Sequence, residues 1–289
     1  MGIFDNLSKF GIKNMDSSDM YNDGKEESKT AKVEEPENKA PEIKESDFVF
    51  QKSYDCPVCS TKFQSLTLKS NKARLVHSDK DLRPIYDFIE PIKYEVVSCP
   101  VCGYSVMARY MAPLTPTQKK LVIENISTPF SGGTKKDKDA ETVSYEEAHD
   151  RISLALACAM VKRAKASEKA YICLKGGWLC RSYGENLDPT EEGYAEKKKM
   201  LEEQEEEFLR NAYDGFLQAR TSEPSPIAGM DDNTISYLLA VFASKYGEYE
   251  TASKMIASIL QSPSAPPRLK DKARDLKEEL IKKIKEKQS

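Results

Sequence analysis

The sequence predicts an α+β fold, in which a small β-rich part precedes an all-α part. The first observation is a change of hydrophobic period. Short runs of β-branched and aromatic residues occupy residues 47–130, whereas apolar residues recur at three- and four-residue steps from residue 144 onward. The second observation is a pair of Cys-x-x-Cys motifs in the β-rich part. We therefore divide the chain into a tail (1–46), a β-rich domain (47–130) and a helical domain (144–289).

The composition is that of a hydrophilic chain with nearly balanced charge. Of its 289 residues 31% are charged, and 44 Lys and Arg against 47 Asp and Glu give a formal net charge of -3. This balance argues against a protein whose whole surface neutralises phosphates, although a local basic face remains open. No run of about 18 apolar residues occurs, so we expect no transmembrane helix.

Cysteine usage and the N-terminus indicate a cytoplasmic protein. Four of the seven cysteines form Cys-x-x-Cys pairs, a pattern that fits a metal site in a reducing compartment better than a disulfide framework. Residues 1–11 lack the charged start, apolar stretch and small-residue cleavage site of a secretory signal.

The tail, residues 1–46, begins with a short amphipathic segment. Ile3, Leu7 and Phe10 lie close to one helical face. After Met20 the tail becomes rich in Glu and Lys and cannot bury enough apolar surface to offset its ordering entropy, so we predict a disordered linker. Residues 3–12 then have three interpretations: a docking peptide for a partner groove, a peripheral membrane contact, or a disordered end with a few apolar residues.

The β-rich part contains three strand-like runs, at residues 63–68, 73–77 and 94–97. Prolines interrupt the stretch between the last two runs. A polar, glycine-containing patch at residues 131–137 predicts a flexible loop that leads into the helical part.

Four cysteines, Cys56, Cys59, Cys99 and Cys102, predict a metal site in this part. Each Cys-x-x-Cys turn directs two thiolates at one ion, and two such turns complete a tetrahedron. Proline follows the first cysteine of each pair, and Gly103 follows the last, where a tight turn is expected. Because four thiolates close the shell, we expect structural Zn²⁺ in a zinc-ribbon-like domain. Iron in the same geometry is the less favoured alternative.

Several pieces around these cysteines carry a family resemblance. They are Phe63 after the first cysteine pair and the stretches 72–75, 79–86, 91–96 and 99–104. With them, residues 48–104 resemble the bacterial family of unknown function DUF2225, and the likeness extends more loosely to about residue 183. The resemblance implies a soluble bacterial protein with a zinc-ribbon-like start and a helical continuation, and it brings no biochemical activity.

Charged and aromatic residues are dense between the two cysteine pairs. A candidate recognition surface comprises Arg74, Asp79, Asp81, Arg83 and Tyr86. The favoured alternative is that Asp79, Asp81 and Arg83 build a turn and salt-bridge this insert onto the ribbon, because surface charge clusters are usually solvated and weakly coupled. His77 is a further ligand candidate, but four thiolates already suffice.

The helical part divides at glycines and prolines into six expected helices. The first begins at Ser144, and the other five cover residues 167–183, 190–220, 233–246, 249–261 and 267–289. Ser144 with Glu147 predicts a capping box. Cys158, Cys173 and Cys180 lie among apolar neighbours and are expected to be core thiols.

Two helix pairs in this part resemble tetratricopeptide repeats. The turn at residues 247–252 matches the Gly-x-Tyr-x-x-Ala pattern of the repeat, and Leu239-Ala240 stands where the repeat has Leu-Gly. Ser236 and Ala243 depart from it, because aromatic residues are usual there. A second, more stretched pair runs from Tyr171 to Pro224. The alternative is an ordinary helical bundle without a peptide groove.

We recognise no nucleophile–base pair and no glycine-rich phosphate loop in the sequence, so we expect that the protein is not an enzyme. The leading hypothesis is a cytoplasmic zinc-binding adaptor that binds an unidentified protein partner through its helices. The alternative is a protein that binds nucleic acid through a local set of basic residues in the ribbon. Acidic residues interspersed among them weaken this alternative. The basic set comprises Lys62, Lys69, Lys72, Arg74, Arg83 and Lys93.

Overall fold

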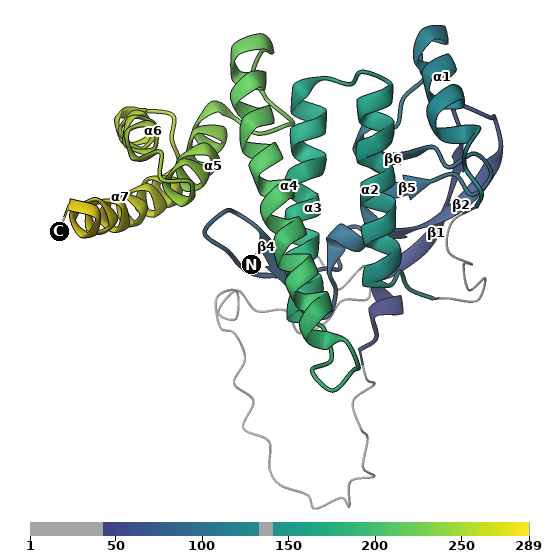
Figure 1. Cartoon of the computed structure of the whole chain (residues 1–289), viewed down its shortest axis with the longest axis horizontal. Helices are drawn as coiled ribbons and strands as arrows, with labels where there is room; N and C mark the ends of the chain where they lie inside the picture. Colours follow the sequence, from purple (N-terminus) through teal and green to yellow (C-terminus); the bar gives the residue numbers. More distant parts are fainter. Residues whose placement is uncertain (1–42, 133–140, 289) are drawn as a thin grey trace, which may run out of the picture. The chain divides into compact units, whose positions relative to one another are not determined.

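The computed structural model describes residues 43–132 and 141–288 (Figure 1). Most of the predicted tail and most of the predicted loop at 131–137 lie outside these residues. The described residues belong to one compact unit, Ile43–Ser289. The division of this unit into a β-rich and a helical domain stays a prediction.

In the described residues, six short strands come first and form three separate two-stranded antiparallel pairs. The strands are β1 (Val49–Asp55), β2 (Lys62–Leu68), β3 (Leu75–Ser78), β4 (Pro84–Tyr86), β5 (Val96–Ser98) and β6 (Ser105–Met107). β1 pairs with β2, β3 with β4, and β5 with β6. The run predicted at 94–97 divides instead into a 3₁₀ turn, Pro91–Tyr94, and β5. Glu90 caps this turn by accepting a hydrogen bond from the Ile92 amide.

Seven helices follow in the described residues. They are α1 (Pro116–Val122), α2 (Tyr145–Val161), α3 (Ala166–Glu185), α4 (Tyr194–Ser222), α5 (Asp232–Lys245), α6 (Tyr249–Gln261) and α7 (Pro267–Gln288). The predicted α+β class, with small strand pairs before a helical part, is confirmed. Ser144 caps α2 by accepting from the Glu147 amide.

Helix α1 was not expected from the sequence, although its start carries a capping box. The Thr115 side chain accepts from the Gln118 amide, the Gln118 side chain accepts from the Thr115 amide, and Pro116 occupies the first turn. A single π-helical turn, Ile123–Ser127, continues it.

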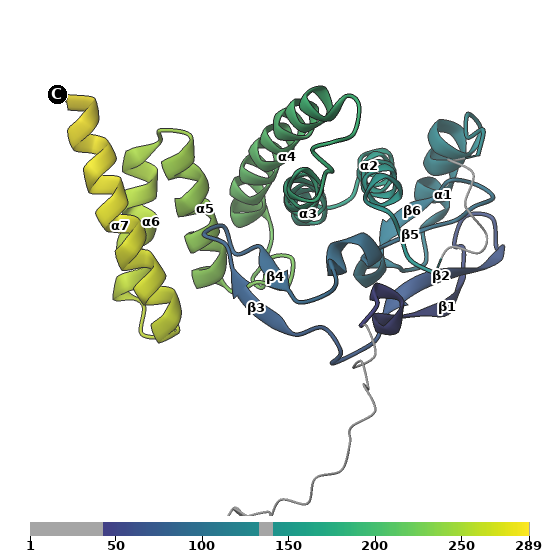
Figure 2. The ribbon, with the colours of Figure 1, turned by 90° about the horizontal axis from the view of Figure 1, so that it is seen from below.

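One hydrophobic core runs from the strands to the last helix. β5 and β6 pack against α2, and α2, α3 and α4 lie side by side, followed by α5, α6 and α7 (Figure 2). A second, smaller core contains Cys56, Cys99 and Cys102 together with Phe63, Tyr104 and Val122. Cys158 belongs to this smaller core, so α2 contributes to both.

The contact between α3 and α4 depends on two glycines. A Cβ at Gly176 would lie 2.8 Å from the ring of Phe208, and a Cβ at Gly177 would lie 2.6 Å from Leu209 Cδ2. Side chains of α4 therefore fill the space that larger residues would take. This close approach explains why glycine occupies both positions, although glycine lowers the stability of a helix.

Cys158, Cys173 and Cys180 are buried, as predicted. Burial raises the pKa of Cys158 to about 11 and those of Cys173 and Cys180 to about 12. In the described part of the chain, no helix has the length and apolarity needed to cross a membrane.

Candidate metal centre

The four cysteines lie on two turns with the same backbone geometry. Cys56 follows β1, and its amide donates to the Thr61 carbonyl at 3.0 Å, while the Cys99 amide after β5 donates to the Tyr104 carbonyl at 2.9 Å. In each turn the residue after the second cysteine is left-handed, with φ 62° at Ser60 and 73° at Gly103. Both Cys-x-x-Cys pairs thus present their sulfur atoms in the same way.

The sulfur atoms converge on one point. All four Sγ atoms lie within 4.8 Å of one another. The Sγ atoms of Cys56 and Cys102 are 3.6 Å apart, as are those of Cys59 and Cys99. A tetrahedral ion with metal–sulfur bonds of about 2.3 Å has sulfur–sulfur edges of about 3.8 Å. The residues present therefore fit a tetrahedral metal ion.

The donor set decides which ions suit this site. Four thiolates favour Zn²⁺ or iron over hard cations, which prefer oxygen ligands. Cys56, Cys99 and Cys102 are buried and Cys59 is exposed at the rim. His77 lies on the exposed strand β3, and the cluster found among the described residues contains only the four cysteines. The cluster can hold a metal ion, and its chemistry leaves Zn²⁺ and iron as the candidates.

The hydrogen bond between Cys56 and Cys102 shifts the pKa values of these two thiols in opposite directions. A hydrogen bond from Cys102 lowers the pKa of Cys56 to about 5, even though burial acts in the opposite direction. The same hydrogen bond, together with burial, raises the pKa of Cys102. Because all four sulfurs must be thiolates to bind a metal, loading the site releases protons.

The second cysteine turn is braced from two sides. The Ser105 amide donates to Cys158 Sγ of α2 at 3.3 Å. On the other side, a Cβ at Gly103 would lie 2.4 Å from the Phe130 ring, so this ring packs directly on the turn. The helical part therefore helps to fix the position of the cluster.

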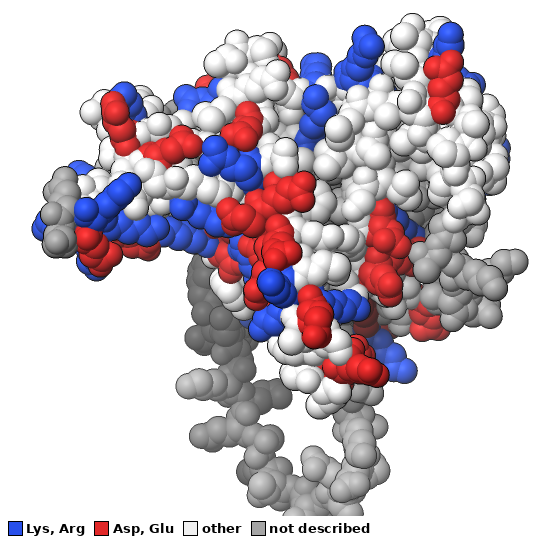
Figure 3. All heavy atoms as spheres, in the orientation of Figure 1, with Lys and Arg blue, Asp and Glu red and all other residues white. Residues whose placement is uncertain are grey.

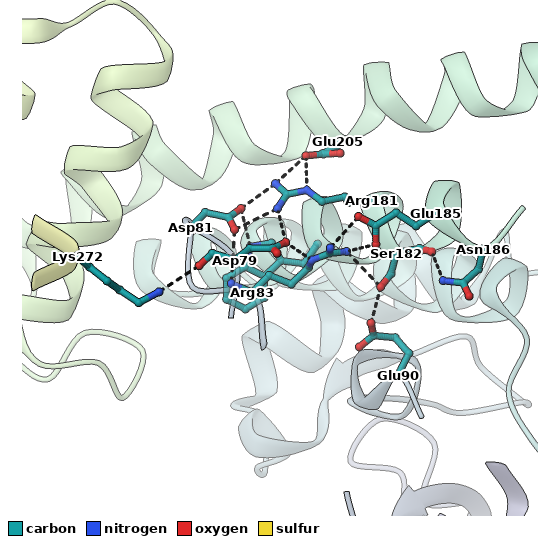
Figure 4. A network of polar contacts seen from close by, with 11 residues as sticks. Asp79, Asp81, Arg83, Glu90, Arg181, Ser182, Glu185, Asn186, Glu205 and Lys272 are labelled. Carbon is teal, nitrogen blue, oxygen red and sulfur yellow. Dashed lines mark hydrogen bonds and ion pairs between the residues drawn. The ribbon is translucent and has the colours of Figure 1, made fainter. Parts of the chain in front are cut away.

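The segment between the cysteine pairs is fastened to α3 by a network of polar contacts (Figure 4). Arg181 donates to both carboxylate oxygens of Asp81, at 3.1 and 2.8 Å, and to Glu205 of α4 at 2.9 Å. The Trp178 indole also donates to Asp81, at 3.1 Å. This arrangement satisfies the Asp81 carboxylate although the residue is only 5% exposed.

Arg83 forms the other half of the network. Its guanidinium binds both carboxylate oxygens of Glu185 at 2.8 Å and donates to Asp79 at 2.6 Å. Ser182 donates to Glu90, whose pKa is raised by burial. The network joins the turn before β4 to one face of α3.

These contacts resemble the predicted alternative in which Asp79, Asp81 and Arg83 build a turn and form salt bridges. The partner is α3, however, and not the ribbon. Asp81 and Arg83 are buried, whereas Arg74 has an exposed side chain 3.9 Å from Asp87 and Tyr86 is half-buried. A recognition role for the five residues stays a prediction.

Sequence reasoning missed the partners that α3 contributes. Trp178, Arg181 and Glu185 are spaced three and four residues apart, which places them on one helical face. That spacing is a signal that the sequence carried. The sequence alone did not reveal which distant segment this face meets.

The chain matches one protein family. A family model described as "Uncharacterized protein conserved in bacteria (DUF2225)" matches residues 49–280, so the chain belongs to this family. The match confirms the resemblance seen around the cysteines and extends it through the helices. No curated protein and no solved structure matches the chain.

Proposed function

We propose that this DUF2225 protein is a non-enzymatic cytoplasmic adaptor, in which a structural zinc ribbon supports tetratricopeptide-like helices that bind a protein partner. The single observation that carries the proposal is the closed set of four cysteines. Their sulfurs occupy every position of a tetrahedral shell, whereas catalytic zinc normally keeps one position open for water or substrate. The ion would therefore hold the fold together and perform no chemistry.

The helical part supports the interaction half of the proposal. α5 and α6 pack against each other across the turn at Gly247, whose φ is 77°. Ala252 and Ile256 are 0% and 2% exposed, at positions where the repeat pattern wants side chains between its helices. Stacked helix pairs of this kind build extended binding surfaces.

Nucleic-acid binding by the ribbon is the second candidate, and part of its basic set is engaged elsewhere. Lys93 is buried and lies 2.7 Å from Glu45, and Arg83 is buried against Glu185. Side chains used in buried ion pairs are not available for phosphates. Lys62, Lys72 and Arg74 are exposed or partly exposed and remain available. The loss of Lys93 and Arg83 from the basic set nevertheless favours the adaptor over a phosphate-binding face.

A pull-down of the tagged full chain from its native cells, under reducing conditions and with or without nuclease, tests the proposal. We expect a stoichiometric protein partner that survives nuclease. Deletion of residues 1–42 asks whether the candidate docking segment at 3–12, which lies outside the described residues, is needed for capture. Partners that vanish with nuclease, or co-purified nucleic acid alone, would replace the adaptor with the nucleic-acid alternative.

A further inference from the structure

A cleft of about 690 Å³ lies where three connecting segments meet. Its walls come from the segment after β6 (109–114), the loop between α2 and α3 (162–165) and the connection from α4 to α5 (223–229). This volume falls within the range of ligand-binding pockets, so the cleft is large enough for a ligand that carries several functional groups. None of the four cysteines and none of the residues of the polar network on α3 lines it, although Met111 and Leu114 of its wall also pack against the core around the cysteines.

Arg109 is held in this cleft against two tyrosine rings. Its guanidinium carbon lies 4.6 Å from the centre of the Tyr171 ring and 5.4 Å from that of Tyr110. A Cβ at Gly229 would lie 2.5 Å from its Nη2 atom, so the backbone there approaches it closely. Among the described residues, no acid lies within ion-pair distance of Arg109. A guanidinium held on rings in this way is preorganised to accept a bidentate anion.

Two more cations of the cleft are uncompensated within the described residues. Arg163 and Lys165 are exposed and form no ion pair there. Figure 3 shows Lys and Arg side chains gathered at the upper end of the molecule, over the loop that joins α2 to α3. Arg163 has φ 54° at the end of α2, a left-handed position at which glycine is usual.

Both acids of the cleft are already engaged. Glu168 lies 2.7 Å from the buried Lys162. Glu223 accepts from the Ser167 amide at 2.9 Å and from the Ser167 hydroxyl, at the start of α3. A carboxylate of the chain itself thus occupies the N-terminus of α3 in the cleft. Because Glu223 keeps its negative charge, the four cations and two acids that line the cleft leave a net charge of +2.

The wall of the cleft includes Tyr110, whose hydroxyl is buried and makes no hydrogen bond among the described residues. Because this oxygen is shielded from solvent, we assign it no contact with a ligand. The prolines and apolar side chains of the walls, including Met111, Leu114 and Pro224, suit an extended chain better than an isolated ion.

From these observations we propose that the cleft binds an acidic peptide segment of a protein partner, whose carboxylates pair with Arg109, Arg163 and Lys165. The proposal rests on the adaptor function above and names the chemistry that this surface recognises. Because the three cations are partly solvated, the binding should weaken as salt concentration rises.

The test is fluorescence anisotropy of the full chain with a labelled Glu-rich peptide and with the same peptide carrying Gln in place of Glu. We expect the Glu peptide to bind the natural protein and the Gln peptide not to bind. The double variant Arg163→Gly/Lys165→Gln should lower the affinity by about tenfold, as the loss of two partly exposed charge contacts predicts. Glycine suits the backbone at position 163, so this variant should keep its fold.

A matched control removes the same charge elsewhere. Lys199→Gln/Lys254→Gln changes two exposed lysines on α4 and α6, with side chains 77% and 75% exposed, and should bind the Glu peptide as the natural protein does. Equal binding of both peptides, or an unchanged affinity of the Arg163→Gly/Lys165→Gln variant, would overturn the cleft proposal. Binding of single-stranded DNA that the same variant abolishes, without peptide binding, would assign the cleft to nucleic acid.

Failure of the cleft and failure of the adaptor can be told apart. If the pull-down yields a stoichiometric partner that the Arg163→Gly/Lys165→Gln variant captures equally well, the adaptor stands and the cleft proposal falls. If the Glu peptide binds in this cleft but no protein partner is captured from cells, the adaptor falls while the recognition of carboxylates stands.

Discussion

The indole of Trp178 donates a 3.1 Å hydrogen bond to the carboxylate of Asp81, a residue 97 positions earlier in the chain. Trp178 is the chain's single tryptophan. Arg181, one turn further along α3, binds the same carboxylate with two hydrogen bonds. The segment before β4 is therefore fixed to the helical part by buried, charge-assisted contacts, and the fluorescence of Trp178 can report on their loss.

Replacing Arg181 with Gln should lower the free energy of unfolding by about 3 kcal/mol, because it leaves the buried Asp81 carboxylate without its cation. Urea denaturation followed by Trp178 fluorescence measures this change. Arg274→Gln, in an exposed pair with Asp271 of α7, serves as the control and should cost less than about 1 kcal/mol. Similar small losses in both variants would show that the network adds little stability.

The network should also make stability depend on pH through Asp79. Burial opposes ionisation of this carboxyl, but hydrogen bonds and charges from Arg83 and Arg181 outweigh it and lower its pKa from the ordinary 3.8. The folded state therefore binds fewer protons than the unfolded state near that pH. This stabilisation is complete above pH 3.8 and is lost as the pH falls through the lowered folded pKa.

The Asp79→Asn variant tests this linkage. The natural protein should be more stable than the variant at neutral pH, and the difference should shrink as the pH falls below 3.8. Urea midpoints measured for both proteins from neutral to acidic pH give the comparison. A difference that stays constant over this range would assign the effect of the substitution to packing rather than to charge.

The glycines of α3 should respond in opposite directions to the same substitution. Gly177→Ala should destabilise the protein, because its Cβ would lie 2.6 Å from Leu209 Cδ2, and we expect a loss of about 1–3 kcal/mol. Gly184→Ala in the same helix meets no atom within 4 Å and should stabilise the protein by up to about 1 kcal/mol. Thermal unfolding of the two variants measures both effects, and equal shifts would contradict close packing at Gly177.

The metal site predicts a defined stoichiometry. Elemental analysis should find one zinc ion per chain in the natural protein and little metal in Cys99→Ser, which loses one of four thiolates. Cys99→Ser should also unfold at lower urea, since binding free energy at a structural site is folding free energy. Cys173→Ala removes a buried core thiol outside the cluster and should keep the ion. One bound iron in place of zinc would select the other metal that suits this geometry.

Local sequence patterns predicted much of the fold. The apolar period and the helix breaks anticipated α2 to α7 to within a few residues at most ends, because helix signals lie within single segments. The spacing of the two cysteine pairs likewise predicted the cluster, since each turn is built by adjacent residues. Helix α1 was not predicted, although the capping box that begins at Thr115 is a signal for its start.

What the sequence by itself determined is which four cysteines form the cluster, namely Cys56, Cys59, Cys99 and Cys102, and the order of strands before helices. Only the tertiary structure decided that Arg83 and Lys93, which resembled a basic surface, are buried in ion pairs. It also decided that Arg109, Arg163 and Lys165 share a cleft. The physical reason is that a coordination turn or a helix depends on neighbours within a few residues, whereas the burial and pairing of a charge depend on segments brought together from distant parts of the chain.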